Sequence, residues 1–390
     1  MISVDDARTQ LLALVRQLEA ETVPLAEAAG RVLAQDVVAR RDQPPFSASA
    51  MDGYAVNAAE VERHAMFKVI GEAAAGHGFQ GRVGAGQAVR IFTGAPVPDG
   101  ASSVVIQEDV SRTGDLITIT SEPGANSNIR PRGGDFIAGQ TVSSPRRLTA
   151  ADIALLAAMN IPSVPVTRRP EVALISTGDE LVMPGDTPEA DQIIVSNTFG
   201  LKAMLDGLGA RARILPIARD TRSALRTAFE LAEGADLVVT IGGASVGDHD
   251  LVADVAADLG LQRSFYKVAM RPGKPLMAGR LNTAAMVGLP GNPVSAMVCG
   301  HVFLAPMIRA MLGLPTTEPA FQTARLAKAL PANGPREHYM RAQLDAEGLQ
   351  AFDNQDSSLL TVLAKANALL VRPPHDPARS VGEMVRYLPI

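Results

Sequence analysis

Residues 236–250 read DLVVTIGGASVGDHD, and this stretch decides how the middle of the chain folds. After Asp236 the residues are apolar or β-branched, which predicts a buried strand over 236–241. Gly242 and Gly243 follow, and a helix is expected after residue 250. Glycines let backbone N–H groups approach an anion closely, and a helix N-terminus adds positive potential. The stretch predicts a strand–turn–helix unit that binds phosphate, although a tight turn before a solvated helix explains the same pattern.

Two side chains of this turn suit phosphate chemistry. Ser245 can donate a hydrogen bond, and Asp250 can hold a cation that neutralises phosphate charge. The stretch GLPGNP at 288–293 repeats the arrangement, with Asn292 expected to cap the next helix and Pro293 at its first position. By itself this is equally well explained as a plain strand-to-helix turn, but two such turns in one unit favour an anion pocket.

Cationic side chains lie between the two turns. Lys267 precedes RPGKP at 271–275, in which two prolines and a glycine hold Arg271 and Lys274 in a restricted loop. A loop fixed before binding lowers the entropic cost of holding an oxyanion. A solvated surface loop is the alternative interpretation.

Carboxylates follow the first predicted strand of this unit, at 172–175. The sequence STGDEL at 176–181 places Asp179 and Glu180 at the strand end, which indicates metal ligation or acid–base chemistry. Helix capping is the alternative for both. Asp220 precedes the helix expected at 221–233, and capping alone explains it.

The order of predicted elements gives the fold class, an α/β multidomain protein. Strands and helices alternate over 169–313, as in a doubly wound parallel sheet with helices on both faces, where ligands bind beyond the carboxyl ends of the strands. Short β-like runs between turns predict an inserted β-rich subdomain at 41–138. Helical patterns over 1–40 and 139–168 predict one helical N-terminal segment. Short β-like pieces over 314–390 predict a small C-terminal β domain.

Capping patterns locate several helix starts. Ser3 and Thr149 each stand three residues before an aspartate, which matches the capping box. The apolar face of the first helix continues to Leu18. Asn197 is expected to cap a later helix.

Composition limits the classes of function. The 390 residues carry a net charge of −5 and no Trp, whereas nucleic-acid or acidic-membrane binders are usually basic, so neither partner is expected. Cys299 is the only cysteine, which excludes an intrachain disulfide and a multi-cysteine zinc site. The N-terminus is acidic where a secretory signal is positive, and the best candidate span, 286–307, is interrupted by prolines and polar residues. A cytoplasmic location is expected.

Three loops of the expected insert carry polar side chains. FSASAMDGYAV at 46–56 contains Asp52, IFTGAP at 91–96 contains Thr93, and NIRPRGGD at 128–135 ends at Asp135. From spacing alone these are loops of unknown purpose, and a structural role is the better interpretation for each.

Taken together, these strings resemble the bacterial MoeA family of molybdopterin molybdenumtransferases and the homologous E domain of gephyrin. SAMDGYAV, RIFTGAPVP, STGDEL, GGASVG, RPGKP and GLPGNPVSA occur in the family's order and approximate spacing, over nearly the whole chain. Ser47 stands where the family often has Asp, Ala244 where Val is usual, Arg271 where Lys is frequent and Gly134 where Glu is frequent. The segment around Ser357 lacks the usual glycine before the serine.

The resemblance implies a fold and a reaction. The fold has a helical segment, an inserted β-rich subdomain, a MogA-like molybdopterin-binding α/β domain and a C-terminal β-barrel. The reaction inserts molybdate into adenylylated molybdopterin, with Mg²⁺-promoted cleavage of the pyrophosphate and release of AMP, to give Mo-molybdopterin. The resemblance also implies a homodimer with a shared active site, and a MogA-type adenylyltransferase is a possible partner.

Residue by residue, the resemblance implies a site. The positions that match the family's active site are Asp52, Thr93, Asp135, Glu180, Asp220, Asp250, Lys267 and Arg271. The positions that match its substrate contacts are Gly242, Gly243, Ser245, Gly247, Lys274, Pro275, Gly291, Asn292, Pro293, Arg341 and Ser357, the last two toward molybdate. Asp250 and Glu180 are the implied metal ligands. Because Asp52, Thr93 and Asp135 lie in another subdomain, they are expected across the dimer interface from the α/β pocket.

Two other classes of function stay open at this point. A non-catalytic scaffold is one, since the gephyrin E domain also binds a receptor loop, but the intact carboxylates Asp52, Glu180 and Asp250 favour an enzyme. A nucleotide-processing enzyme of the competence-damage type is the other, and the matches at 51–54 and 93–94 argue against it. Molybdate and tungstate are not distinguished, because both are tetrahedral dianions of similar size.

Overall fold

The computed structural model describes residues 1–390 except 123, 244–250 and 317–320. The chain forms two compact units. The first contains Met1–Glu21, Gly30–Ala34 and Val166–Ile390, and the second contains Thr22–Ala29 and Gln35–Pro165. The chain passes between the two units at four places, and two of them fall within strands, β1 (Ala20–Pro24) and β14 (Ser163–Thr167).

A six-stranded sheet forms the centre of the first unit. In spatial order its strands are β18 (Arg211–Ile214), β15 (Glu171–Ser176), β19 (Leu237–Ile241), β23 (Ala284–Leu289), β22 (Met277–Leu281) and β20 (Leu261–Tyr266). The first four run parallel, β22 runs antiparallel to them, and β20 runs antiparallel to β22 and therefore in the direction of the first four. The expected wholly parallel sheet is therefore wrong at this end. The two-residue turn Asn282–Thr283 joins β22 to β23 as a hairpin, where a parallel pair would need a crossover helix.

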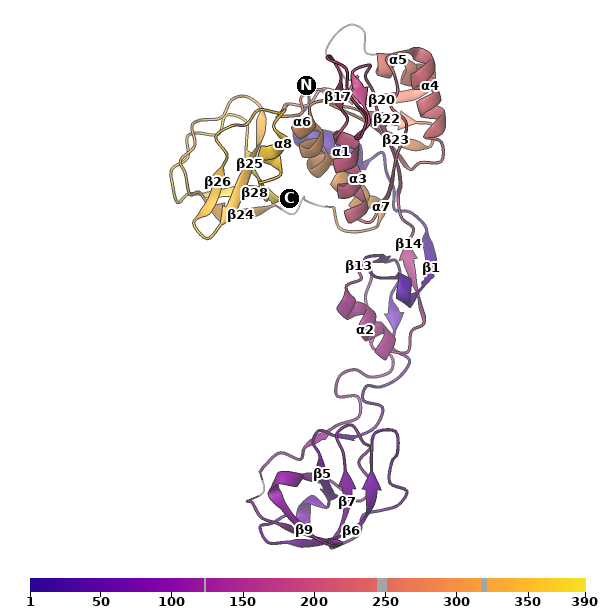
Figure 1. Cartoon of the computed structure of the whole chain (residues 1–390), viewed down its shortest axis with the longest axis vertical. Coiled ribbons are helices and arrows are strands. Elements are labelled where there is room, and N and C mark those ends of the chain that lie inside the picture. The colour runs from indigo at the N-terminus through magenta and orange to yellow at the C-terminus, as the bar shows by residue number, and fades with distance from the viewer. Residues whose placement is uncertain (123, 244–250, 317–320) are drawn as a thin grey trace. The chain divides into compact units, whose positions relative to one another are not determined.

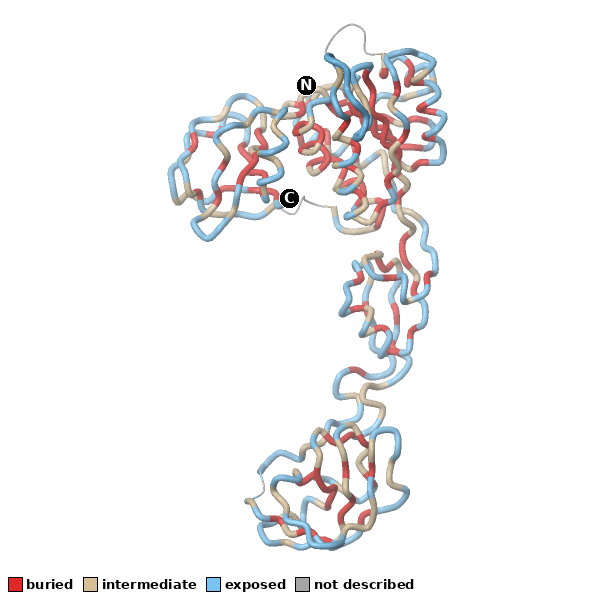
Figure 2. The backbone as a smooth tube through the Cα atoms, viewed as in Figure 1, coloured by how far each residue is buried: buried red, intermediate tan, exposed pale blue. Residues whose placement is uncertain are grey.

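Helices cover both faces of this sheet, as predicted (Figure 1). One face packs against α1 (Val4–Leu12), α3 (Asn197–Gly207) and the run α6 (Pro293–Cys299), η4 (Gly300–Leu304) and α7 (Ala305–Met311). The other packs against α4 (Arg222–Leu231) and α5 (Leu251–Asp258). Because both faces are covered, β19 and β23 are buried along their whole length, which explains their continuous apolar sequence (Figure 2).

The helical run Pro293–Met311 has the length and apolar character that a membrane span requires. Within the protein, however, 72% of its most apolar window is buried. Its side chains, among them Val298, Phe303 and Ile308, belong to the core of the first unit. The run is therefore explained as a core helix, in which the π-helical turn η4 separates α6 from α7.

Local capping signals give a mixed outcome. The capping boxes at Ser3 and Thr149 are confirmed, the second at the start of α2 (Ala150–Ala158). The first helix ends at Leu12, well before Leu18. Asn197 is the first residue of α3 and does not cap it, and Thr221 caps α4 in place of Asp220. The Asn197 amide has a tertiary partner instead, the Gly291 carbonyl, which local patterns do not reveal.

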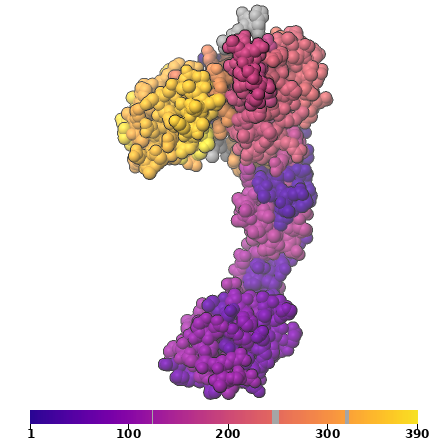
Figure 3. Space-filling view, in the orientation of Figure 1, coloured from indigo at the N-terminus to yellow at the C-terminus, as the bar shows by residue number. Residues whose placement is uncertain are grey.

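The C-terminal residues form a small barrel, seen as one continuous yellow lobe in Figure 3. Its strands, in spatial order, are β21 (Met270–Arg271), β25 (Glu337–Asp345), β27 (Ala368–Arg372), β28 (Met384–Pro389) and β24 (Gln322–Arg325), with β26 (Gly348–Ala351) on β25. A bridge from Leu326 to Leu349 joins the end of β24 to β26 and closes the circle. One short helix, α8 (Leu360–Leu363), follows β26. The strand β21 comes from the middle of the chain, so Arg271, the first residue of RPGKP, belongs to the barrel sheet.

The second unit centres on another six-stranded sheet. In spatial order its strands are β8 (Ser103–Ile106), β5 (Gly53–Val56), β7 (Gln87–Ile91), β6 (Met66–Ala73), β10 (Leu116–Ile119) and β9 (Val110–Thr113). All neighbours are antiparallel except β6 and β7. Short elements complete the unit: η1 (Leu25–Glu27), β3 (Val37–Val38), β4 (Ala48–Ser49), η2 (Ala58–Glu60), η3 (Gln107–Asp109), β11 (Ile129–Arg130), β12 (Thr141–Val142) and β13 (Arg146–Arg147). Apolar residues fill both sides of the sheet.

Candidate functional site

A cavity of about 530 Å³ lies at the carboxyl ends of β15, β19 and β23, where a doubly wound fold binds its ligand. We call it the carboxyl-edge cavity. Its walls are formed by Ser176, Thr177, Glu180, Leu181, Ile193, Ile194, Val195, Ser196, Asn197, Ile241, Gly242, Pro275, Pro290, Gly291, Asn292, Pro293 and Ser358. Six residues expected in the site, Glu180, Gly242, Pro275, Gly291, Asn292 and Pro293, therefore meet at one place.

The turn after β23 links the cavity to the barrel. Asn292 is the residue before α6 and Pro293 is its first residue, as predicted, but the Asn292 side chain makes no capping bond. Its amide donates to the Ser357 hydroxyl at 3.1 Å, and the Val294 N–H donates to the Ser357 carbonyl at 3.1 Å. On the other side, the Asn197 amide donates to the Gly291 carbonyl at 2.7 Å. The turn is thus held by two distant segments.

The turn after β19 depends on glycine. Gly242 has a φ of +94°, and a Cβ there would lie 2.6 Å from the Thr177 carbonyl oxygen. Gly243 follows with a φ of +65°. Only residues without a side chain let the two neighbouring strand ends approach this closely.

Replacement of Gly242 by alanine is expected to destabilise the first unit by about 1–3 kcal/mol, through strain and the clash with backbone. Urea unfolding measures the effect. Gly291→Ala is the matched control, since among the described residues its Cβ would meet only the Gly242 Cα, at 3.6 Å, and it should cost less than about 0.5 kcal/mol. Equal stability of the two variants would contradict the prediction.

Three carboxylates gather beside the cavity. The Asp220 N–H donates to Asp179 Oδ1 at 3.0 Å, and the Glu180 carboxylate lies over Gly178, whose φ is +145°. Partial burial, together with the negative charges of Asp179 and Glu180, raises the pKa of Asp220. Negative charge therefore accumulates at this corner, where the Arg219 guanidinium is turned to the carbonyls of Asp179 and Leu181, at 2.5 and 3.3 Å.

The mutual repulsion of these carboxylates fits a divalent cation shared with a substrate. Among the described residues, no three His, Cys, Asp or Glu side chains converge closely enough to hold a metal by themselves. Mg²⁺ is commonly bound by one or two carboxylates together with substrate phosphates. Glu180 therefore suits such a role, whereas Asp250, the other expected metal ligand, lies outside the described residues, as do Ser245 and Gly247.

The cationic loop is held on three sides. It is closed by the Val268 N–H, which donates to the Lys274 carbonyl at 3.1 Å. Ile2 bridges to Val268, and β21 pairs with β25, with Arg271 opposite His338. Burial, followed by the charge of Arg271 and three further arginines, lowers the pKa of His338 to about 4. His338 is thus neutral at physiological pH and adds no charge to the loop.

The cations of this loop differ in their surroundings. The Arg271 side chain is exposed and Lys274 is partly buried. Lys267 Nζ lies over the Tyr266 ring, 5.3 Å from its centroid. None of the three is among the described residues that line the carboxyl-edge cavity, although Pro275 of the same loop is.

Arg341 is buried, with only 1% of its surface exposed. Its guanidinium donates to Gln355 Oε1 at 3.3 Å and to the carbonyls of Leu359 and Asn354 at 3.3 and 3.4 Å. Burial lowers the pKa of Arg341. In this arrangement Arg341 organises the loop that carries Ser357, and Ser358 of that loop lines the cavity.

The second unit contains a separate polar pair. Thr93 donates to Asp52 Oδ1 through its N–H at 2.7 Å and through its hydroxyl at 2.8 Å. These bonds, aided by the charge of Arg90, lower the pKa of Asp52, so its carboxylate is ionised at neutral pH. Asp135 is exposed, and its N–H donates to the Gln43 carbonyl at 2.9 Å.

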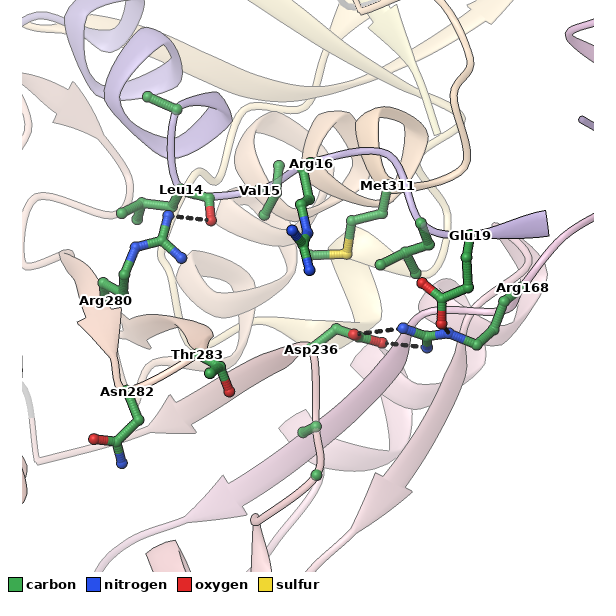
Figure 4. Close-up of a pocket in the computed structure, with 14 residues that line it drawn as sticks. Leu14, Val15, Arg16, Glu19, Arg168, Asp236, Arg280, Asn282, Thr283 and Met311 are labelled. Carbon is green, nitrogen blue, oxygen red and sulfur yellow. Dashed lines mark hydrogen bonds and ion pairs between the residues drawn. The ribbon is translucent and has the colours of Figure 1, made fainter.

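Another cavity, of about 660 Å³, lies at the opposite edge of the central sheet (Figure 4). Arg168 there donates to both oxygens of Asp236, at 2.8 and 2.9 Å, and to Glu19 at 2.5 Å. Arg280 donates to the Leu14 carbonyl at 2.8 Å. These contacts tie the segment after α1 to the start of β19, which indicates a structural role. The lining of this second cavity contains none of the expected site residues.

Two features of the carboxyl-edge cavity went unnoticed in the sequence. In the motif STGDEL only the carboxylates were expected to act. The hydroxyl residues Ser176 and Thr177 also line the cavity, together with Glu180. The pair β16 (Leu181–Val182) and β17 (Ile193–Ile194) adds an apolar wall. Two adjacent hydroxyls at a strand end were a usable signal, but nothing local pointed to 193–194.

Family models match three consecutive regions of the chain. They are described as "MoeA N-terminal region (domain I and II)" for residues 2–160, "Probable molybdopterin binding domain" for 173–310 and "MoeA C-terminal region (domain IV)" for 323–390. The fold and the site therefore define a multidomain protein with a molybdopterin-binding domain at its centre.

The chain belongs to the MoeA family. A relative from Nostoc sp., named molybdopterin molybdenumtransferase, is 37% identical over 100% of this chain and 94% of its own length. One of the same name from Haemophilus influenzae is 36% identical over 100% and 98%. The crystal structure of the MoeA protein from Pyrococcus horikoshii OT3 matches over 100% of both chains, with a TM-score of 0.85 and 26% identity.

Proposed function

We propose that this chain inserts molybdate into adenylylated molybdopterin and releases AMP, giving Mo-molybdopterin. The observation that carries the proposal is the carboxyl-edge cavity, in which the Gly242 and Gly291 turns, Glu180 and Asn292 come together. The cavity lies almost wholly within the region matched to a molybdopterin-binding domain.

In this proposal each group has a role set by its chemistry. The two glycine turns and the positive potential at the start of the helix that begins at Pro293 bind the pyrophosphate. The N–H groups of Gly242 and Val294 do not take part, because they donate to the carbonyls of Leu289 and Ser357. Glu180, with Asp250, holds the metal. Mg²⁺ held there would polarise the phosphoryl oxygens and stabilise the AMP leaving group. Arg271 and Lys274 attract the molybdate dianion, and their preformed loop limits the entropic cost of binding it.

Further parts of the proposal concern assembly. A homodimer brings Asp52, Thr93 and Asp135 of one subunit to the cavity of the other. Lys267, Asp220, Arg341 and Ser357 act around the same site, the last two by shaping the loop next to molybdate. A MogA-type adenylyltransferase supplies the substrate, and the reaction takes place in the cytoplasm.

The decisive experiment mixes the purified protein with adenylylated molybdopterin, Mg²⁺ and molybdate. AMP release and molybdenum uptake are followed together. The proposal expects both, at equal stoichiometry, and dependence of both on Mg²⁺. Release of AMP without molybdenum uptake at any molybdate concentration would overturn it.

Arg271→Ala is expected to raise the molybdate concentration for half-maximal turnover about ten- to a hundredfold, the value of one charge-assisted contact. The fold should be retained, because the side chain is exposed and the pairing with β25 uses backbone. Arg271→Lys keeps the charge and is the control, with an effect of only a few-fold. An unchanged molybdate titration of Arg271→Ala would count against this role.

A further inference from the structure

The floor of the carboxyl-edge cavity carries two hydroxyls that have no partner. Ser176 and Thr177 are 2% and 3% exposed, and both line the cavity. Within the described part of the chain, neither Oγ atom makes a hydrogen bond. A buried hydroxyl left without a partner costs free energy, so such groups are usually paired with protein or ordered water, a place that a ligand with polar atoms can take.

Backbone hydrogen bonds hold the strand end that carries these hydroxyls. The Ala218 N–H donates to the Ser176 carbonyl at 2.9 Å, and the Thr177 N–H donates to the Ile241 carbonyl at 3.0 Å. The strand end is thus pinned to its neighbours on both sides. Donors and acceptors fixed in this way lose little entropy when a ligand arrives.

The cavity wall next to this floor is apolar. Ile193 and Ile194 both line it, and they are 57% and 39% exposed although they are large apolar side chains. They form β17, whose partner β16 leads away from Glu180. Such a site suits a flat heterocycle. The apolar wall can contact the face of the ring, and the polar floor can hydrogen-bond to its edge.

We propose that Ser176 and Thr177 bind the hydrogen-bonding edge of the pterin ring, with Ile193 and Ile194 against the ring face. Each hydroxyl can donate to a ring nitrogen or carbonyl oxygen and accept from a ring N–H or amine. This assignment rests on the proposed function and adds the residues that select the heterocycle. The glycine turns and Glu180 then serve the phosphates, farther along the same substrate.

The test uses the full chain and a simple probe, the oxidised compound 6-hydroxymethylpterin. Its binding is followed by the anisotropy of its own fluorescence, in a protein that contains no Trp. No molybdate, Mg²⁺ or turnover is involved, so pterin binding can fail while molybdenum insertion holds, and the reverse. AMP is titrated in parallel by calorimetry, to separate the pterin half from the nucleotide half.

Thr177→Val is expected to weaken pterin binding about two- to tenfold, and Ser176→Ala similarly. Neither should lower the melting temperature, because each removes a hydroxyl that has no hydrogen-bond partner among the described residues. AMP affinity should stay unchanged. Thr198→Val is the matched control: its hydroxyl is also buried and unpartnered among the described residues, but it does not line the cavity.

Three results would overturn the assignment. The first is a pterin affinity that is unchanged in both variants, or no binding of the pterin to the unmodified chain at millimolar pterin concentration. The second is an equal loss in Thr198→Val. The third is a loss of AMP affinity in place of pterin affinity, which would give the hydroxyls to the nucleotide.

Discussion

Glu180→Gln is expected to lower Mg²⁺-dependent AMP release about a hundredfold, the loss typical when a group that holds a catalytic metal is removed. The variant keeps the shape of a side chain that lies over Gly178 and lines the carboxyl-edge cavity. It removes only the charge, so the fold should be retained. The measurement is AMP release against Mg²⁺ concentration.

A second measurement on the same variant tests the electrostatics independently. The charge of Glu180 helps to raise the pKa of Asp220, so that pKa should fall in Glu180→Gln, as followed by NMR titration. Glu189→Gln is the control, because it removes an exposed charge from the same segment outside the cavity. Normal Mg²⁺-dependent AMP release by folded Glu180→Gln would refute the role of Glu180.

Asp250→Ala should likewise keep the fold and lose Mg²⁺-dependent AMP release.

Two inactive variants are expected to restore each other's activity when they are produced in one cell. Asp52→Ala and Glu180→Ala lie in different units of the chain, and the proposed dimer takes one residue from each subunit for every site. Random pairing gives half mixed dimers, each with one intact site of two. Activity should therefore return to about a quarter of that of the unmodified protein.

The reciprocal mixture is the control. The double variant Asp52→Ala/Glu180→Ala, combined equally with the unmodified chain, leaves about a quarter of the activity if sites are shared and about half if each chain has its own. No recovery from the two single variants, together with one half in the reciprocal mixture, would establish sites within single chains. Either outcome is read from AMP release alone.

Local sequence signals predicted much of the α/β architecture. The strand before Gly242, the Asn292–Pro293 helix start and the capping boxes at Ser3 and Thr149 all depend on neighbouring residues. Such features follow from backbone preferences and apolar spacing within a few residues. The expected capping roles of Asn197 and Asp220 were wrong because the Asn197 amide reaches the Gly291 carbonyl and Thr221 caps α4.

The alternation of strands with glycine turns was enough, from the amino-acid order alone, to place a ligand site at one sheet edge. Which side chains meet there was decided by contacts between distant segments. Ser357 reaches Asn292 across 65 positions, Ile2 bridges to Val268, and β25 pairs with β21. The hydroxyls of Ser176 and Thr177 and the apolar wall at 193–194 are likewise brought together by contacts between distant segments. Sheet order and barrel closure bring such residues together, and short-range propensity carries no information about either.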